Sequence, residues 1–271
     1  MEEMSDILTH FTLKEKPFQL LPNPRFMYLS EPYLETKAKI QYFLKDRSAS
    51  LYLFGGIGTG KTSLLRLIAQ EVSDDKETLA RYIIAPALKT SNQLLRLICD
   101  NFGVKTERSQ QATLKNLENF LIKQAKAKQF PLVLIDEAQN LTHEQLKLIH
   151  YLLNFVSNEQ VLLMIVLVGQ PELSQKIERF SSLKSRLISA SLSEMTRDDM
   201  ERMIKFRWSV AAGDPKLTPP FNKLVYDLVY QITKGNPRET VKLCYGALLQ
   251  AFLKKAKTIT KEDIKKAQKE L

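Results

Sequence analysis

The residues of this chain with the clearest chemistry form a glycine-rich turn in its first quarter. Residues 55–62 read GGIGTGKT and fit the pattern GxxxxGK(S/T), whose backbone amides surround phosphate groups. Glycine permits the backbone angles of such a loop, and the start of the following helix adds partial positive charge. We expect Lys61 to reach the β- and γ-phosphates of ATP and Thr62 to ligate Mg²⁺. The residues predicted to bind the nucleotide here are Gly56, Ile57, Gly58, Thr59, Gly60, Lys61, Thr62 and Ser63.

An acidic pair follows a second apolar segment. Residues 132–137 read LVLIDE, so a buried strand would bring Asp136 and Glu137 to its carboxyl end, where open α/β sheets bind ligands. We predict that Asp136 holds the Mg²⁺ of the nucleotide through a water molecule. Glu137 would orient and polarise the attacking water. Such a pair favours hydrolysis of ATP over transfer of its phosphate to another substrate.

Further polar residues follow the third apolar segment, residues 161–170 (VLLMIVLVGQ). Gln170 ends this segment and could bind the γ-phosphate or the attacking water, although a cap or turn residue is the alternative. Arg179 and Arg186 come next. An arginine at the edge of a subunit can stabilise the transition state in a neighbouring copy, whereas outside an oligomer either one would be an ordinary surface charge.

Arg238 lies in the sequence GNPR, in the first turn of a predicted helix. The helix dipole disfavours a cation at that end, so we interpret Arg238 as a partner for the phosphates of the nucleotide. An ion pair with Glu239 or another nearby acid is the alternative.

Apolar runs alternate with helical patterns up to about residue 192. We predict strands over 50–54, 80–85, 131–135, 161–168 and 188–192, and helices over 33–46, 62–72, 94–102, 114–127, 142–156 and 172–180. This alternation indicates an α/β fold of the P-loop type, with helices on both faces of a parallel sheet. Beyond Ser193 only helices are predicted, over 196–211, 221–233 and 237–254 and from about 260. Three regions follow: an ordered, extended arm over residues 1–35, an α/β nucleotide-binding domain over 36–192, and an all-helical lid over 193–271.

The charge of the chain suits an anionic partner. The formal net charge is +10 and the sequence pI is about 9.4, which favours nucleic acid or a membrane surface, although the charge could serve solubility alone. Lys89 and Thr90, after the second strand, could contact the phosphates of DNA, or this segment could cap the next helix, with Ser91 as the cap. The lysines of residues 123–128 and 254–269 are better explained as a helix end and a solvated face.

Other features bear on location and on metal binding. The acidic N-terminus lacks the basic and apolar regions of a secretion signal. The most apolar stretch, residues 161–168, is shorter than the roughly 20 residues of a membrane helix. We therefore predict a cytoplasmic protein without a membrane span. Cys99 and Cys244 have apolar, helical surroundings and are predicted to be buried, and the three histidines have no zinc-binding spacing.

Together these motifs resemble those of the AAA+ ATPases over nearly the whole chain. Four segments are similar to the ExeA-type branch, which shares its ATPase module with the transposition regulators TnsC, TniB and MuB. The segments are residues 11–30, 136–140 (DEAQN), 167–173 (LVGQPEL) and 235–246 (GNPRETVKLCYG).

The resemblance implies a role for each site residue. Lys61 and Thr62 correspond to the Walker A pair, Asp136 and Glu137 to the Walker B pair, Gln170 to sensor 1, Arg186 to the arginine finger acting in trans, and Arg238 to sensor 2. It also implies that the arm packs near the adenine through Phe18, Pro22 and Phe26.

The function we expect is that of an ATP-dependent regulator that forms a ring or a helical filament on double-stranded DNA. The resemblance implies a role in transposition, in which the protein recruits or activates a transposase or target-selector protein. Secretion ATPases of the branch usually continue into a membrane span and a peptidoglycan-binding region, and this chain stops after the lid. The alternatives are an ExeA-like secretion or assembly ATPase that acts on protein or cell-wall partners, and a helicase loader or replication initiator.

Overall fold

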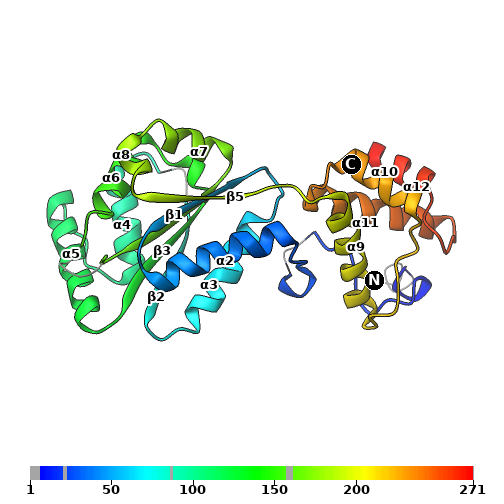
Figure 1. Cartoon of the computed structure of the whole chain (residues 1–271), viewed down its shortest axis with the longest axis horizontal. Helices are drawn as coiled ribbons and strands as arrows, with labels where there is room; N and C mark the ends of the chain where they lie inside the picture. Colours follow the sequence, from blue (N-terminus) through cyan, green and yellow to red (C-terminus); the bar gives the residue numbers. More distant parts are fainter. Residues whose placement is uncertain (1–6, 21–22, 86–87, 157–160, 271) are drawn as a thin grey trace. The chain divides into compact units, whose positions relative to one another are not determined.

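The structure of the chain, a computed structural model, describes residues 7–20, 23–85, 88–156 and 161–270. The chain forms two compact units (Figure 1). The first comprises Met1–Pro32, Gly58–Ser63 and Ser193–Leu271, and the second comprises Tyr33–Ile57 and Leu64–Leu192. Each unit buries a hydrophobic core of its own.

The second unit contains the predicted parallel sheet. Its order is β2-β3-β4-β1-β5, and every pair of neighbours is parallel. The strands are β1 (Ser50–Gly55), β2 (Thr78–Ile84), β3 (Phe130–Asp136), β4 (Met164–Gly169) and β5 (Leu187–Leu192). The strand that leads into the glycine-rich loop, β1, and the strand that ends in the acidic pair, β3, both neighbour β4. Because the strands are parallel, their carboxyl ends lie at one edge of the sheet.

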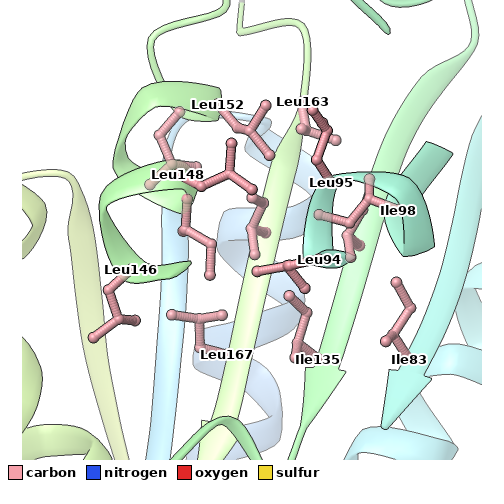
Figure 2. Close-up of a cluster of buried hydrophobic side chains, with 14 of the residues drawn as sticks. Ile83, Leu94, Leu95, Ile98, Ile135, Leu146, Leu148, Leu152, Leu163 and Leu167 are labelled. Atoms are coloured by element: carbon pink, nitrogen blue, oxygen red, sulfur yellow. The ribbon is translucent and has the colours of Figure 1, made fainter. Parts of the chain in front are cut away.

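Helices cover both faces of this sheet (Figure 1). They are α2 (Glu31–Asp46), α3 (Lys61–Ser73), α4 (Ser91–Phe102), α5 (Gln110–Lys126), α6 (His143–Leu152), α7 (Pro171–Glu178) and the short α8 (Ser181–Lys184). Figure 2 shows one face, where side chains of α4 and α6 meet Ile135 and Leu167 from the strands. The alternate strand residues Leu134 and Val166 are also fully buried. Burial on both faces explains why these strands are continuous apolar runs.

Some element boundaries differ from the prediction for local reasons. Strand β4 begins at Met164, because Val161 forms an isolated antiparallel bridge with Val156. Helix α5 begins before the predicted residue 114, because the side chain of Ser109 caps it by accepting from the backbone N–H of Ala112. The helix predicted over 172–180 is α7 (Pro171–Glu178), and the short α8 follows it at Ser181–Lys184.

The cap of α4 also differs from the prediction. The cap is Thr90, and Ser91 is the first helical residue. The Thr90 hydroxyl accepts from the Gln93 N–H, while the Gln93 side chain accepts from the Thr90 N–H. This reciprocal pair satisfies two backbone donors that a helix start would otherwise leave open.

The first unit contains four helices of the C-terminal region together with the N-terminal arm. The helices are α9 (Arg197–Ala212), α10 (Lys223–Thr233), α11 (Pro237–Leu253) and α12 (Lys261–Glu270), and the arm includes the 3-10 turn η1 (Pro24–Phe26). Phe11, Phe18 and Phe26 of the arm are buried in the same core as Trp208 of α9. Of the arm residues singled out in the sequence, Pro22 lies outside the described residues. Packing of the arm near adenine remains a prediction.

One arginine holds the arm against α9. The Arg207 guanidinium donates to the backbone carbonyls of Pro17 (3.0 Å), Gln19 (3.1 Å) and Phe26 (3.0 Å). Burial lowers the pKa of Arg207 to about 10. Three charge-assisted hydrogen bonds offset part of the cost of burying this charge.

Both cysteines are buried, as predicted: Cys99 lies in the core of the second unit and Cys244 in the core of the first. Burial raises the pKa of the Cys99 thiol to about 12, which is typical of a structural rather than a reactive cysteine. Among the described residues, no helix is both long enough and apolar enough to cross a membrane.

Candidate active site

The glycine-rich loop connects β1 to α3, the strand-to-helix position that the motif requires. Gly58 and Gly60 have φ values of 81° and 100°, in the left-handed region that favours glycine. Thr59 and Lys61 are buried, at 3% and 9% exposure. The loop therefore has the backbone geometry expected of a phosphate cradle, with its lysine held inside the protein.

Gly58 is also restricted by its neighbours within the first unit. A Cβ atom at this position would lie 2.5 Å from the Asn236 Oδ1 atom and 2.9 Å from the Arg238 Cβ atom. Both residues belong to the turn at the start of α11, where Asn236 caps the helix by accepting from the N–H groups of Arg238 and Glu239. Glycine is therefore required here by space as well as by backbone angle.

Arg238 lies in the first turn of α11, as predicted, and its side chain is exposed. The alternative ion pair with Glu239 does not form, because Glu239 pairs with Lys242 at 3.3 Å. Arg238 forms no ion pair within the described part of the chain. Its proposed contact with the nucleotide phosphates is compatible with this geometry and stays a prediction.

Asp136 is the last residue of β3 and is 3% exposed. Its Oδ1 atom accepts from the N–H of Glu137 at 2.9 Å, and its Oδ2 atom accepts from the Tyr82 hydroxyl at 2.8 Å. Burial, followed by the hydrogen bond to Asp136, raises the pKa of Tyr82 to about 12. Tyr82 therefore stays protonated at neutral pH and remains a donor that orients this carboxylate.

Glu137 is partly exposed and begins the turn η2 (Ala138–Asn140) with a left-handed backbone, at φ 54° and ψ 32°. A left-handed conformation is uncommon for a residue with a side chain, and such conformations cluster at functional sites. The Glu137 Oε2 atom accepts from the Gln139 amide at 2.6 Å. The carboxylate thus has a defined orientation at the carboxyl edge of the sheet.

Gln170 follows β4 and takes the N-cap position of α7, but its side chain makes no capping hydrogen bond. Gln170 is therefore a cap residue by its backbone position only, and its side chain does not cap the helix. Its backbone N–H donates to the Gln139 Oε1 atom at 3.1 Å. Asp136, Glu137 and Gln170 consequently lie at the carboxyl ends of two neighbouring strands, β3 and β4; the sequence predicted each strand end but not that the strands are neighbours.

Arg179 and Arg186 are both exposed in the second unit. Their neighbour Lys184 pairs with Glu178 at 2.5 Å, whereas neither arginine forms an ion pair among the described residues. Both side chains are therefore open to a partner.

The two residues predicted to contact DNA, Lys89 and Thr90, differ in whether their side chains already have a role in the fold. Lys89 is exposed. The Thr90 hydroxyl, by contrast, already caps α4. Cap formation accounts for Thr90 without DNA, and Lys89 remains as a possible phosphate contact.

The residues that would hold Mg²⁺ fit that ion chemically. A buried carboxylate, Asp136, and the hydroxyl of Thr62 are hard oxygen donors, which Mg²⁺ prefers alongside nucleotide phosphates and water. The Tyr82 hydroxyl and the Glu137 N–H fix the Asp136 carboxylate without using positive charge. These two donors therefore hold the carboxylate in one orientation.

Three residues with structural roles at this site were not identified from the sequence: Tyr82, Gln139 and Lys176. Each has a partner that is distant in the chain, as in the pairings of Tyr82 with Asp136 and of Gln139 with Gln170. The sequence signal was weak, since it consisted of a tyrosine in a strand, a glutamine within the DEAQN motif and a lysine on a helix. Only Gln139 stood inside a segment that had been singled out.

The fold and this constellation of residues define a P-loop protein that hydrolyses nucleotides. Residues 45–177 match the family model described as AAA domain. The chain is 33% identical over 268 residues to General secretion pathway protein A of Aeromonas hydrophila, covering 96% of this chain and 48% of the relative. The chain thus spans about half the length of this relative.

Solved structures show the same fold at low sequence identity. The ORC1 protein of Aeropyrum pernix in complex with DNA has a TM-score of 0.69 at 17% identity, covering 96% of this chain and 70% of that one. The RuvB Holliday junction branch migration motor of Thermotoga maritima has a TM-score of 0.57 at 18% identity, covering 91% and 73%. The chain is therefore a P-loop ATPase with an AAA+ fold, and its residues 45–177 match the AAA domain family.

Proposed function

We propose that this AAA+ ATPase is a nucleotide-driven switch that assembles with further copies of itself on double-stranded DNA. The observation that carries the proposal is the charge of the chain, which has 40 lysines and arginines against 30 acidic residues. An excess of this size favours a polyanionic partner, bound mainly through its phosphates. The likeness to DNA-bound ORC1 supports the fold alone, so it is compatible with this partner and does not select it.

Exposed lysines in each unit could contact the phosphates of DNA, although those of α5 also end a helix and those of α12 also form a solvated face. At the end of α5, Lys123, Lys126 and Lys128 are exposed and form no ion pair among the described residues. On α12 the same holds for Lys265 and Lys266. Lysines without acidic partners keep their charge available to the backbone of DNA.

ATP would be bound and hydrolysed as follows. The loop amides and Lys61 bind the phosphates, while Thr62 and Asp136 hold the metal. When bound, Mg²⁺ would supply positive charge against the charge that develops on the phosphates. Glu137 accepts the proton of the water that attacks the γ-phosphate, and Gln170 orients that phosphate or the water.

Two arginines would complete the site. Arg238 contacts the nucleotide phosphates from the start of α11, and Arg186 of a neighbouring copy stabilises the charge of the transition state. A finger supplied in trans makes hydrolysis depend on assembly into a ring or filament, and Arg179 is the alternative residue for this role.

Within this proposal the DNA-bound assembly regulates transposition, the role implied by the resemblance to TnsC, TniB and MuB. A transposase or a target-selector protein would then recognise the ATP-bound assembly. Hydrolysis at Glu137 would end that recognition by releasing the copies from DNA. We place this work in the cytoplasm.

The test measures the affinity of the full chain for a labelled DNA duplex with ATP, with ADP and without nucleotide, across a salt series. We expect tight binding with ATP at low salt and an affinity that falls linearly with the logarithm of the salt concentration. ATPase activity should rise when duplex is added. No binding with ATP at low salt would exclude the proposal.

A second function is favoured by a specific observation, the 33% identity to General secretion pathway protein A across 96% of the chain. Under this alternative, the ATPase drives assembly of a secretion or cell-surface machine and acts on protein or cell-wall partners. Its ATPase activity would then be indifferent to duplex DNA. The same measurement therefore separates the two functions.

A further inference from the structure

The turn that follows β3 is linked to the end of β4 by one side chain, that of Gln139. Its amide nitrogen donates to the Glu137 Oε2 atom at 2.6 Å. Its amide oxygen, Oε1, accepts from the backbone N–H of Gln170 at 3.1 Å. A single side chain thus uses both ends of its amide to connect the two strand ends.

The backbone of this turn is held as firmly as the side chain. Lys176 of α7 donates to the carbonyl of Gln139 at 2.5 Å and to the carbonyl of Leu141 at 2.9 Å. A lysine that bridges two carbonyls of one short turn limits movement of the backbone between them. The backbone from which the Gln139 side chain extends is therefore held in place by Lys176.

The space for the amide is provided by a glycine, Gly169, at the end of β4. A Cβ atom at Gly169 would lie 2.7 Å from the Gln139 Oε1 atom and 3.0 Å from its backbone nitrogen. Contacts under 3.0 Å require a shift of the atoms involved. The backbone of β4 therefore closely approaches this amide, and any side chain at Gly169 would displace it.

We propose that Gln139 is a positioning residue for Glu137, and this inference rests on the proposed role of Glu137 as the group that activates water. The amide occupies one carboxylate oxygen, Oε2. The other oxygen, Oε1, has no hydrogen-bond partner among the described residues and is left to accept from water. Because Gln139 also binds the Gln170 backbone, a change at the end of β4 alters the direction of the carboxylate.

The orientation matters because a base must lie within hydrogen-bond reach of the proton it accepts. A displacement of about 1 Å in such a group costs on the order of 10²-fold in rate. Glu137 has a left-handed backbone, and its carboxylate has only the Gln139 amide as a hydrogen-bond donor in the described part of the chain. Loss of this donor leaves the rotamer of Glu137 undetermined.

A purely structural role for Gln139 makes a different prediction. If Gln139 only stabilised the turn, its replacement would lower the unfolding temperature and leave the turnover of each folded molecule unchanged. If it positions Glu137, its replacement lowers kcat while KM and ATP affinity stay near the wild-type values. The split between kcat and KM therefore distinguishes the roles.

The experiment compares the steady-state ATPase of the full chain with that of Gln139→Glu, Gln139→Ala and Gly169→Ala. Gln139→Glu keeps the size of the side chain and an acceptor for the Gln170 N–H, but it replaces the donor to Glu137 with a negative charge. Gly169→Ala leaves Gln139 in place and displaces its amide. Gln175→Ala is the matched control, because Gln175 is an exposed glutamine of α7.

We expect kcat to fall by about 10- to 100-fold in all three variants, with KM and ATP affinity changed by less than about twofold. The control should behave as the wild type. Wild-type kcat in Gln139→Glu and Gln139→Ala would overturn the inference, as would a rise in KM with kcat unchanged. Thermal unfolding of each variant shows whether a lower rate results from a smaller fraction of folded protein.

A Glu137→Gln variant separates this inference from the one on which it rests. If Glu137→Gln hydrolyses ATP at the wild-type rate, Glu137 is not the base and the inference for Gln139 fails with it. If Glu137→Gln is inactive while the Gln139 variants have wild-type kcat, only the inference for Gln139 fails.

Discussion

Asp136 and Glu137 are adjacent in the chain, but their side chains have different surroundings. Asp136 is buried, and its two oxygens accept from Tyr82 and from the backbone, which fixes the orientation of the carboxylate. Glu137 is partly exposed and keeps one oxygen without a partner in the described part of the chain. These surroundings suit a metal ligand and a general base, respectively.

The two halves of the site should fail in different ways. Lys61→Ala removes the charge that meets the phosphates, so nucleotide binding should weaken. Glu137→Gln keeps the size of the side chain and removes the base, so kcat should fall on the order of 10²- to 10⁴-fold while ATP binding persists. Fluorescent nucleotide titration and steady-state ATPase measure these effects, and normal hydrolysis by Glu137→Gln would refute the assignment.

Tyr82 should influence the metal rather than the nucleotide. Tyr82→Phe keeps the ring and removes the hydroxyl that donates to Asp136 at 2.8 Å. Loss of a partner that orients a metal ligand costs roughly 10- to 100-fold in metal affinity, so the Mg²⁺ concentration for half-maximal ATPase should rise about tenfold. Tyr151→Phe, at a 50% exposed tyrosine of the same unit, is the control. An unchanged Mg²⁺ requirement in Tyr82→Phe would contradict this role.

Sequence alone was sufficient for residues whose chemistry lies in one contiguous motif. The glycine-rich loop and the acidic pair were predicted because each motif has its spacing and its flanking strand within a few residues. Tyr82 and Gln139 could not be assigned roles, because these depend on which strands are neighbours in the sheet. That order, β2-β3-β4, is a property of the fold and not of any local pattern.

At the scale of elements, capping side chains decide where the helices begin. The reciprocal pairs Thr90 with Gln93 and Thr142 with Gln145 start α4 and α6, and Asn236 starts α11. A Thr-x-x-Gln pattern and an Asn-Pro pair mark the starts of α6 and α11 in the sequence. The cap of α4 was assigned one residue too late, because threonine and serine are adjacent and both can cap.

The attachment of the N-terminal arm to α9 makes a separate prediction about stability. Arg207→Ala would leave the carbonyls of Pro17, Gln19 and Phe26 without this donor. A partly buried acceptor without a partner costs about 1–3 kcal/mol, so we expect the free energy of unfolding of this unit to fall by about 3 kcal/mol in all. Chemical denaturation measures it, and Arg202→Ala, at an exposed arginine of α9, is the control.

A loss of stability in Arg207→Ala no larger than that in Arg202→Ala would show that the arm is held by its aromatic side chains instead. Phe11 and Phe18, which pack near Trp208 with ring centroids 6.0 and 6.4 Å away, provide that apolar contribution. The prolines and aromatic residues of the arm predicted that it is ordered. They did not show that it attaches to α9, because Arg207 and its partners are far apart in the sequence.

At the scale of the whole molecule, the alternation of strands and helices was enough to predict the fold. Apolar strands that alternate with helices along the chain are typical of a parallel sheet with helices on both faces. The chain shares this fold with DNA-bound ORC1 and with a branch migration motor, and its sequence is similar to a secretion protein. The fold therefore supports the ATPase activity, and the proposed DNA partner rests on the charge of the chain.

The central claim is that ATP drives assembly of this chain on double-stranded DNA, and electron microscopy of Glu137→Gln tests it most directly. This variant should bind ATP without hydrolysing it and so accumulate the assembled state. With ATP and duplex we predict rings or filaments along the DNA, and with ADP single copies. Single copies in the presence of ATP and duplex, at concentrations where nucleotide binding is saturated, would contradict the account.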